Sequence, residues 1–165
     1  MTVVSKRTSR REFLIQKQLY KIVPKYIPKP IGYSSGGIMK TKKCGMSLKK
    51  WFSSQKCIKS SLISQIIKNV RLILGKIRRR YPGFRHMDLH IGNVLMCNGR
   101  IMLIDFGLSK MNARRVQVNR DMNTFIKSLR LFLRKKRRKV LTKKKEESAA
   151  DIAKRITQGR QFKGI

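Results

Sequence analysis

Acidic residues are scarce in this chain. Its 165 residues include 42 Lys and Arg but only 7 Asp and Glu, which gives a formal net charge of +35 at pH 7. Charge of one sign at this density repels itself in the compact state unless a polyanion neutralises it. We therefore expect nucleic acid or another acidic surface among the partners.

Long apolar runs are also missing. No segment approaches the roughly 20 consecutive apolar residues of a membrane span, and the N-terminal MTVVSKRTSRREF lacks the apolar stretch of a signal peptide. We therefore expect an intracellular protein with no membrane contact. Hydrophobic residues still make up 41% of the chain, which is enough for one core, and the length suits a single globular domain.

Cysteines are few and widely spaced. The chain has Cys44, Cys57 and Cys97, and neither a CxxC pair nor a Cys–His pair is present. An odd number without such spacing argues against a disulfide framework and against a zinc site. The sequence therefore predicts reduced thiols.

Turn signals and capping patterns predict the N-terminal elements. Ser9, followed three residues later by Glu12, forms a capping-box pattern that predicts a helix near residues 9–20. Between residues 25 and 43, β-rich pieces flank the turn cluster SSGG, which predicts two strands joined by a short loop. The prolines of the first strand place it at a sheet edge.

Hydrophobic periodicity predicts the later elements. Apolar residues repeat with a period of about 3.6 over residues 60–80, so a long amphipathic helix is expected there. The Asn98-Gly99 dipeptide between two short apolar runs predicts a β-hairpin. The helical period returns over residues 121–133, and a second capping box predicts a last short helix from Ser148.

Positive charge is densest in RLFLRKKRRKVLTKKK, residues 130–145. Its KKRRKV segment is typical of a nuclear address or a nucleic-acid contact. The alternative is the solvated end of a helix. We expect residues 134–165 to form a basic tail that includes the short helix.

Two of the scarce acids lie in HMDLHIGNVLMCNGRIMLIDFGLSK, residues 86–110. Asp88 is followed five residues later by Asn93, and the predicted hairpin brings in Asp105 after twelve more. Converging carboxylate and amide oxygens suit Mg²⁺, which takes few protein ligands and completes its shell with water and substrate phosphates. The alternative is an ordinary loop and hairpin.

Two motifs coincide with these oxygen donors. Asp88 lies in H-x-D-x-x-x-x-N and Asp105 begins D-F-G, and in this order they resemble the catalytic and metal loops of protein-kinase-like phosphotransferases. The resemblance covers residues 1–133. It implies an α+β, protein-kinase-like fold with a truncated N-lobe and hinge in residues 1–43 and a reduced, mainly helical C-lobe in residues 44–133.

Residues 1–140 contain four carboxylates, and each falls where the resembled fold has one. Asp88 would be the catalytic base that accepts the proton of the acceptor hydroxyl. Asn93, which belongs to the same catalytic loop, would hold Mg²⁺ against the phosphates of ATP together with Asp105. Asp121 would anchor the catalytic loop, and Glu12 would pair with the phosphate-binding lysine.

The resemblance also implies residues for ATP. Lys6, in a short strand that resembles V-A-I-K, would contact the phosphates, while an unpaired surface lysine is the rival interpretation. Met39, Lys40 and Thr41 would form the hinge beside adenine, with a strand that binds no ligand as the alternative. His86 would be a scaffold residue that packs the catalytic loop against D-F-G.

The chain departs from the resembled pattern in several ways. No G-x-G-x-x-G loop precedes Lys6, and GYSSGG reads as a β-turn. Met87 stands where regulated kinases carry an Arg that would bind a phosphorylated activation loop. No A-P-E follows D-F-G, so we expect no activation-loop phosphorylation site. His90 makes the catalytic loop similar to those of RIO, aminoglycoside and choline phosphotransferases and of miniature kinase-like proteins of large DNA viruses.

Two functions follow as expectations. The first is an Mg²⁺- and ATP-dependent phosphotransferase, similar to serine/threonine protein kinases, that transfers the γ-phosphate to a hydroxyl of a protein or a small molecule. The second is a catalytically impaired, kinase-derived scaffold that binds nucleic acid through residues 130–145. Within the intracellular expectation, the basic run and the viral resemblance leave the nucleus and the virion open as locations.

Overall fold

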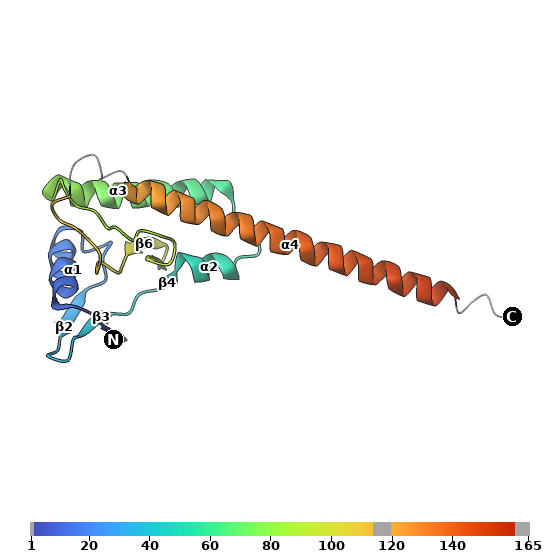
Figure 1. Ribbon diagram of the computed structural model, residues 1–165, viewed down its shortest axis with the longest axis horizontal. Helices are drawn as coiled ribbons and strands as arrows, with labels where there is room; N and C mark the ends of the chain where they lie inside the picture. Colours follow the sequence, from blue (N-terminus) through green and yellow to red (C-terminus); the bar gives the residue numbers. More distant parts are fainter. Residues whose placement is uncertain (1, 114–119, 161–165) are drawn as a thin grey trace. The chain divides into compact units, whose positions relative to one another are not determined.

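The computed structural model describes residues 2–113 and 120–160 and has an α+β architecture (Figure 1). This confirms the α+β class that was predicted from the sequence. The chain divides into two units, Met1–Leu129 and Arg130–Ile165. Two small antiparallel sheets lie in the first unit.

The first sheet contains three strands in the order β1-β3-β2. Their bounds are Val3–Arg7 for β1, Pro30–Tyr33 for β2 and Ile38–Lys42 for β3. β2 is an edge strand, as its prolines predicted, because proline has no N–H to donate to a neighbour. The β1–β3 register places Lys6 opposite Met39.

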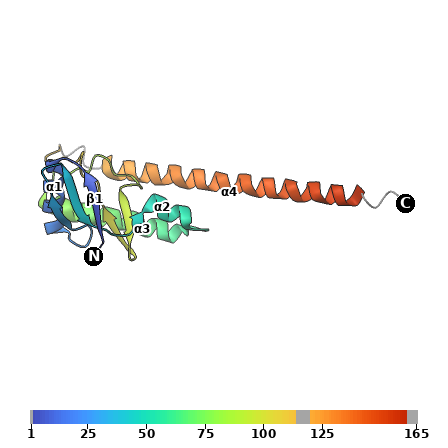
Figure 2. The ribbon, with the colours of Figure 1, turned by 90° about the horizontal axis from the view of Figure 1, so that it is seen from below.

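Helix α1 (Arg10–Ile22) follows β1 after a two-residue connection and packs against β2 (Figure 2). Ser9 caps it by accepting the N–H of Glu12 at 3.2 Å, which confirms the predicted start. The carboxylate of Glu12 does not return to the cap, because Lys6 and Thr8 bind it instead. The helix therefore buries a carboxylate toward the first sheet.

The second sheet has the order β4-β5-β6. Its strands are β4 (Met46–Ser47), β5 (Val94–Cys97) and β6 (Arg100–Leu103). Asn98 and Gly99 have φ values of 48° and 74°, the left-handed pair that a two-residue hairpin requires. The predicted hairpin is therefore confirmed, whereas β4 is too short for its sequence to show a period.

Helices α2 (Leu48–Ser54) and α3 (Ser60–Arg80) supply much of the core. α3 begins and ends where the hydrophobic period predicted. Its buried face consists of Ile66, Val70, Ile73, Leu74 and Ile77. Burying each such side chain contributes about 1.5–3 kcal/mol, so this face is a main source of stability beneath the second sheet.

Residues 43–45 connect the two sheets. Gly45 has a φ of 53°, and a Cβ there would collide with the backbone of Met96, so only glycine fits. Beside it, Cys44 and Cys97 form a disulfide with Cα atoms 5.5 Å apart. The prediction of reduced thiols was wrong for this pair, because β4–β5 pairing joins positions that sequence spacing separates. Cys57 is free and exposed.

Helix α4 runs without a break from Arg120 to Arg160. The prediction of a helix over residues 121–133 is confirmed, but the separate short helix from Ser148 was wrong. The segment has no proline, its one glycine lies in the last turn, and Lys, Arg, Glu, Leu and Ala favour a helix throughout. Residues 161–165 of the predicted tail lie outside the described residues. Across the described ranges, none of the helices combines the length and apolarity of a membrane span.

Candidate active site

Lys6 is the centre of an ion-pair cluster. Its Nζ lies 3.0 Å from Oε1 of Glu12 and 2.7 Å from Oδ1 of Asp105. Burial alone lowers the pKa of Lys6, but the hydrogen bonds that Lys6 donates to Asp105 and Glu12 outweigh it and raise the pKa above its ordinary value. The ammonium is therefore charged at neutral pH. The structure pairs Lys6 with Glu12, as predicted, and adds Asp105, which was predicted only as a metal ligand.

Glu12 is the buried member of this cluster, with 3% of its surface exposed. One carboxylate oxygen accepts the bond from Lys6, and the other accepts the hydroxyl of Thr8. Buried carboxylates are stable only when both oxygens are bonded in this way. Thr8 was missed by sequence reasoning, because a single threonine before a helix carries no distinctive signal.

The cluster lines a pocket of about 390 Å³. Lys6, Glu12 and Asp105 supply charge to its wall. Apolar side chains supply other parts of the lining, among them Val4, Met39, Leu95 and Ile104. A pocket with charged groups and an apolar lining suits a ligand that has both an anionic and a flat apolar part.

The three residues predicted as a hinge lie on different faces of strand β3. Met39 is buried and Thr41 half-buried, and both line the pocket, whereas Lys40 is exposed and does not. Successive strand residues point to opposite faces, which explains the split. All three lie inside β3, and the connection between the sheets is residues 43–45, which also line the pocket. The three residues predicted as a hinge therefore lie within a strand, and the connection between the sheets comes after them.

Asp88 and Asn93 are joined to each other in the H-x-D loop, residues 86–93. Nδ2 of Asn93 donates to the carbonyl oxygen of Asp88 at 2.9 Å and to its Oδ2 at 3.0 Å. This leaves Oδ1 of Asn93 as the acceptor atom of the amide. The carbonyl of Asn93 accepts the N–H of Ile104 at 3.1 Å. The loop is thereby bonded to the residue that precedes Asp105.

Asp121 fixes the start of the H-x-D loop, as predicted. It is 1% exposed and accepts the backbone N–H groups of His86 at 2.9 Å and Met87 at 3.1 Å. Arg78 of α3 pairs with the same carboxylate at 2.9 Å. The first turn of α4 is therefore hydrogen-bonded to the loop that carries Asp88.

His86 packs the H-x-D loop against D-F-G, in the scaffold position that was predicted. Its ring is fully buried and lies 5.1 Å from the ring of Phe106. Burial lowers the pKa of His86 below its ordinary value, so the ring is neutral and its Nε2 donates to the carbonyl of Ile104 at 2.9 Å. Its Nδ1 is buried without a hydrogen-bond partner among the described residues.

Backbone strain occurs at both candidate loops. Met87 has a φ of 71° and Asp105 a φ of 65°, left-handed values that cost a residue with a Cβ about 1 kcal/mol. Gly107 follows Asp105 closely, and a Cβ there would lie 3.0 Å from Oε2 of Glu12. The glycine of D-F-G therefore permits the close approach of α1.

The chemistry of the donor set fits Mg²⁺. No group of three His, Cys, Asp or Glu converges within residues 2–113 and 120–160, so a closed transition-metal site has no support there. The half-exposed carboxylate of Asp105 and the amide oxygen of Asn93 are hard ligands. Two such oxygens match the few protein ligands that Mg²⁺ takes beside substrate phosphates.

Comparisons with known proteins do not assign the chain to a family. No protein-family model matches it, and no curated protein sequence matches it either. Function is therefore inferred from the pocket, the Lys6 cluster and the two loops.

Proposed function

We propose that this chain is an Mg²⁺- and ATP-dependent phosphotransferase, similar to serine/threonine protein kinases, that transfers the γ-phosphate of ATP to a hydroxyl group. The observation that carries the proposal is the Lys6–Glu12–Asp105 cluster on the wall of a partly apolar pocket. A lysine held by a buried carboxylate has a fixed position from which to bind phosphate. Asp105, on the same lysine, would ligate the metal.

The remaining roles follow from the loops. Bound Mg²⁺ would neutralise charge on the phosphates, held by Asp105 and Asn93. Asn93 occupies Oδ2 of Asp88, so the other oxygen is available to accept the proton of the acceptor hydroxyl. Catalysis of this kind depends mainly on positioning and charge stabilisation. The hydrogen bonds that hold both loops would keep the reacting groups in position.

The fold supports the same proposal. A small sheet with α1, a connection at residues 43–45 and a helix-rich part after it have the order expected of a truncated protein-kinase-like domain. Residues 1–43 would form the reduced N-lobe with its hinge, and residues 44–133 the C-lobe. Val4, Met39 and Leu95 would then contact adenine.

A labelled-ATP assay with Mg²⁺ tests the phosphotransferase. The full chain is incubated with a panel of protein and small hydroxyl acceptors, next to Lys6→Ala, Asp88→Asn and Asp105→Asn. We expect each variant to lower kcat at least about 100-fold, because each removes a charged group that acts on the reacting atoms.

Lys40→Ala is the matched control for the lysine variant, because Lys40 lies on the same sheet but outside the pocket. It should retain full transfer. Equal residual transfer by wild type and all variants, with unchanged circular dichroism, would contradict the proposal. That result would favour the kinase-derived scaffold.

A second function, binding of nucleic acid, has its own observation. Residues 130–145 lie on one unbroken helix, α4. Where the exposure of this run is described, six basic side chains are exposed, the first of them Arg130 and the others further along the helix. The others are Arg134, Lys135, Arg137, Arg138 and Lys139. A helix with this many exposed cations is suited to bind the phosphates of a nucleic-acid duplex.

Duplex DNA affinity measured against salt concentration tests this second function. We expect log K to fall with log salt. Replacement of Arg137, Arg138 and Lys139 by Gln should reduce the slope by about 0.9 for each phosphate that is no longer neutralised. Replacement of Lys17, Lys21 and Lys25 by Gln removes the same charge elsewhere and should leave most of the slope. A slope near zero for wild type would exclude the binding.

A further inference from the structure

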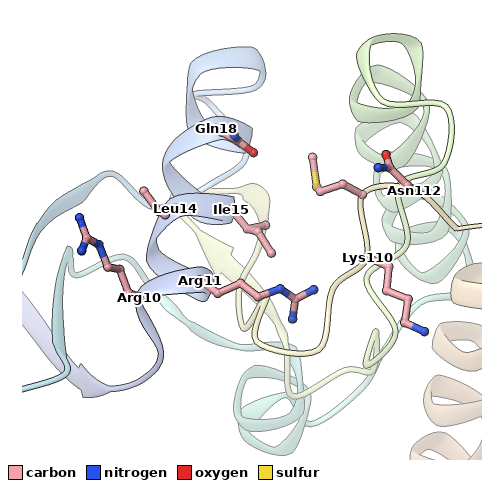
Figure 3. Close-up of a pocket in the computed structure, with 8 residues that line it drawn as sticks. Arg10, Arg11, Leu14, Ile15, Gln18, Lys110 and Asn112 are labelled. Atoms are coloured by element: carbon pink, nitrogen blue, oxygen red, sulfur yellow. The ribbon is translucent and has the colours of Figure 1, made fainter.

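Arg11 connects α1 to the segment that follows Asp105. Its Nη2 donates to the carbonyl of Ser109 at 2.6 Å and its Nη1 to the carbonyl of Gly107 at 3.4 Å. Figure 3 shows Arg11 extending from α1 toward the loop that carries Lys110, beside a hollow of about 630 Å³. The planar fork of a guanidinium suits two neighbouring acceptors, because its N–H groups are held in a fixed geometry.

Ser109 is hydrogen-bonded both to Arg11 and to the H-x-D loop. It is fully buried, its N–H donates to the carbonyl of Phe106 at 3.0 Å, and its Oγ donates to the carbonyl of His86 at 3.2 Å. The next residue, Lys110, exchanges backbone hydrogen bonds with Arg85 at 2.8 and 2.9 Å. The D-F-G segment, residues 105–110, is therefore bonded to α1 on one side and to the H-x-D loop on the other.

Two adjacent residues of α1 thus hold the two ends of this segment. Glu12 reaches Asp105 through Lys6, and Arg11 reaches Gly107 and Ser109 directly. Asp105 has strained, left-handed backbone, which persists only where the surroundings fix it. A shift of α1 would release both contacts together.

We propose that Arg11 is a positioning residue that keeps Asp105 in its metal-binding orientation. This role rests on the proposed function. Ser109 is the one hydroxyl residue in the D-F-G segment and is fully buried, so contacts within the fold have to order this segment. Arg11 supplies that order constitutively, from the same helix that positions Lys6.

The test compares Arg11→Ala and Arg11→Lys with Arg10→Ala. Arg10 is exposed, carries the same charge and lies outside the 390 Å³ pocket. For each folded variant we measure kcat and KM for ATP, and Mn²⁺ affinity in the presence of a non-hydrolysable ATP analogue. Arg11→Ala should lower kcat and Mn²⁺ affinity about tenfold with KM nearly unchanged. Arg11→Lys should recover part of both, and Arg10→Ala should match wild type.

Hydrogen exchange separates positioning from stability. Amides of residues 105–110 should exchange faster in Arg11→Ala while those of α3 keep wild-type rates, because the substitution removes only local hydrogen bonds. Uniformly faster exchange, or a kcat and Mn²⁺ affinity within twofold of wild type, would overturn the positioning role. If wild type binds Mn²⁺ with nucleotide but transfers nothing, the proposed function fails while the Mn²⁺ comparison still decides Arg11. If wild type binds neither, both proposals fail.

Discussion

At the scale of single residues, His86 makes stability depend on pH. Its burial lowers the pKa of the ring in the folded chain, whereas the unfolded chain titrates near 6.5. Below that pH the unfolded state binds a proton that the folded state does not. The free energy of unfolding therefore falls as pH decreases, by up to about 1.4 kcal/mol for each pH unit.

Urea unfolding at pH 7.5 and pH 5.5 measures this dependence. Carboxylates have pKa values near 4 in unfolded chains, so they contribute little in this window. His90 is 41% exposed and serves as the control: His90→Gln should keep the pH dependence, and His86→Gln should lose most of it. Equal stability of the wild type at both pH values would contradict the burial of a neutral His86.

Single residues also mark the limit of prediction from sequence. Asp88, Asn93 and Asp105 could be proposed as site residues because each stands in a motif of fixed spacing. Lys6 was predicted from the strand that it shares with neighbouring β-branched residues. The structure gives it the expected partner, Glu12, and a second carboxylate, Asp105, that was not expected. Arg11 was not predicted, since its partners are backbone carbonyls that leave no trace in side-chain patterns.

At the scale of elements, local signals were sufficient where one signal dominates. The Ser9 cap, the 3.6 period of α3 and the Asn98-Gly99 turn each determine their element from a few neighbouring residues. The prediction of a helix break before Ser148 was wrong because two local signals competed there. A capping box only favours a helix start, whereas the helix propensity summed over α4 favours continuation.

Strand pairing sets a different limit on elements. The expected hinge lay at residues 39–41, but β3 extends through Lys42 because β1 and β2 both pair with it. Pairing also gives β4 its two residues, opposite Leu95 and Met96. The partners of β4 are far away in sequence, so local pattern alone could not predict that strand.

At the scale of the whole molecule, charge relates the two proposed functions. An excess of 35 positive charges creates a field that attracts anions and raises their local concentration. ATP and nucleic acid would both respond to it. Within the proposed site, Lys6 lies 2.7 Å from the carboxylate of Asp105 and Asn93 lies 3.0 Å from that of Asp88, so these carboxylates have partners at short range.

The Cys44–Cys97 disulfide joins positions 53 residues apart and so closes a covalent ring around α2, α3 and the H-x-D loop. The exposed stretch between α2 and α3, residues 55–59, lies inside that ring and suits an inserted protease site. After cleavage there, we expect one band on a non-reducing gel and two after a dithiol is added. A Cys97→Ser variant should give two bands in both cases, and separation of the wild-type pieces without reductant would contradict the ring. In such a ring, one cut in the backbone opens the loop but does not divide the molecule.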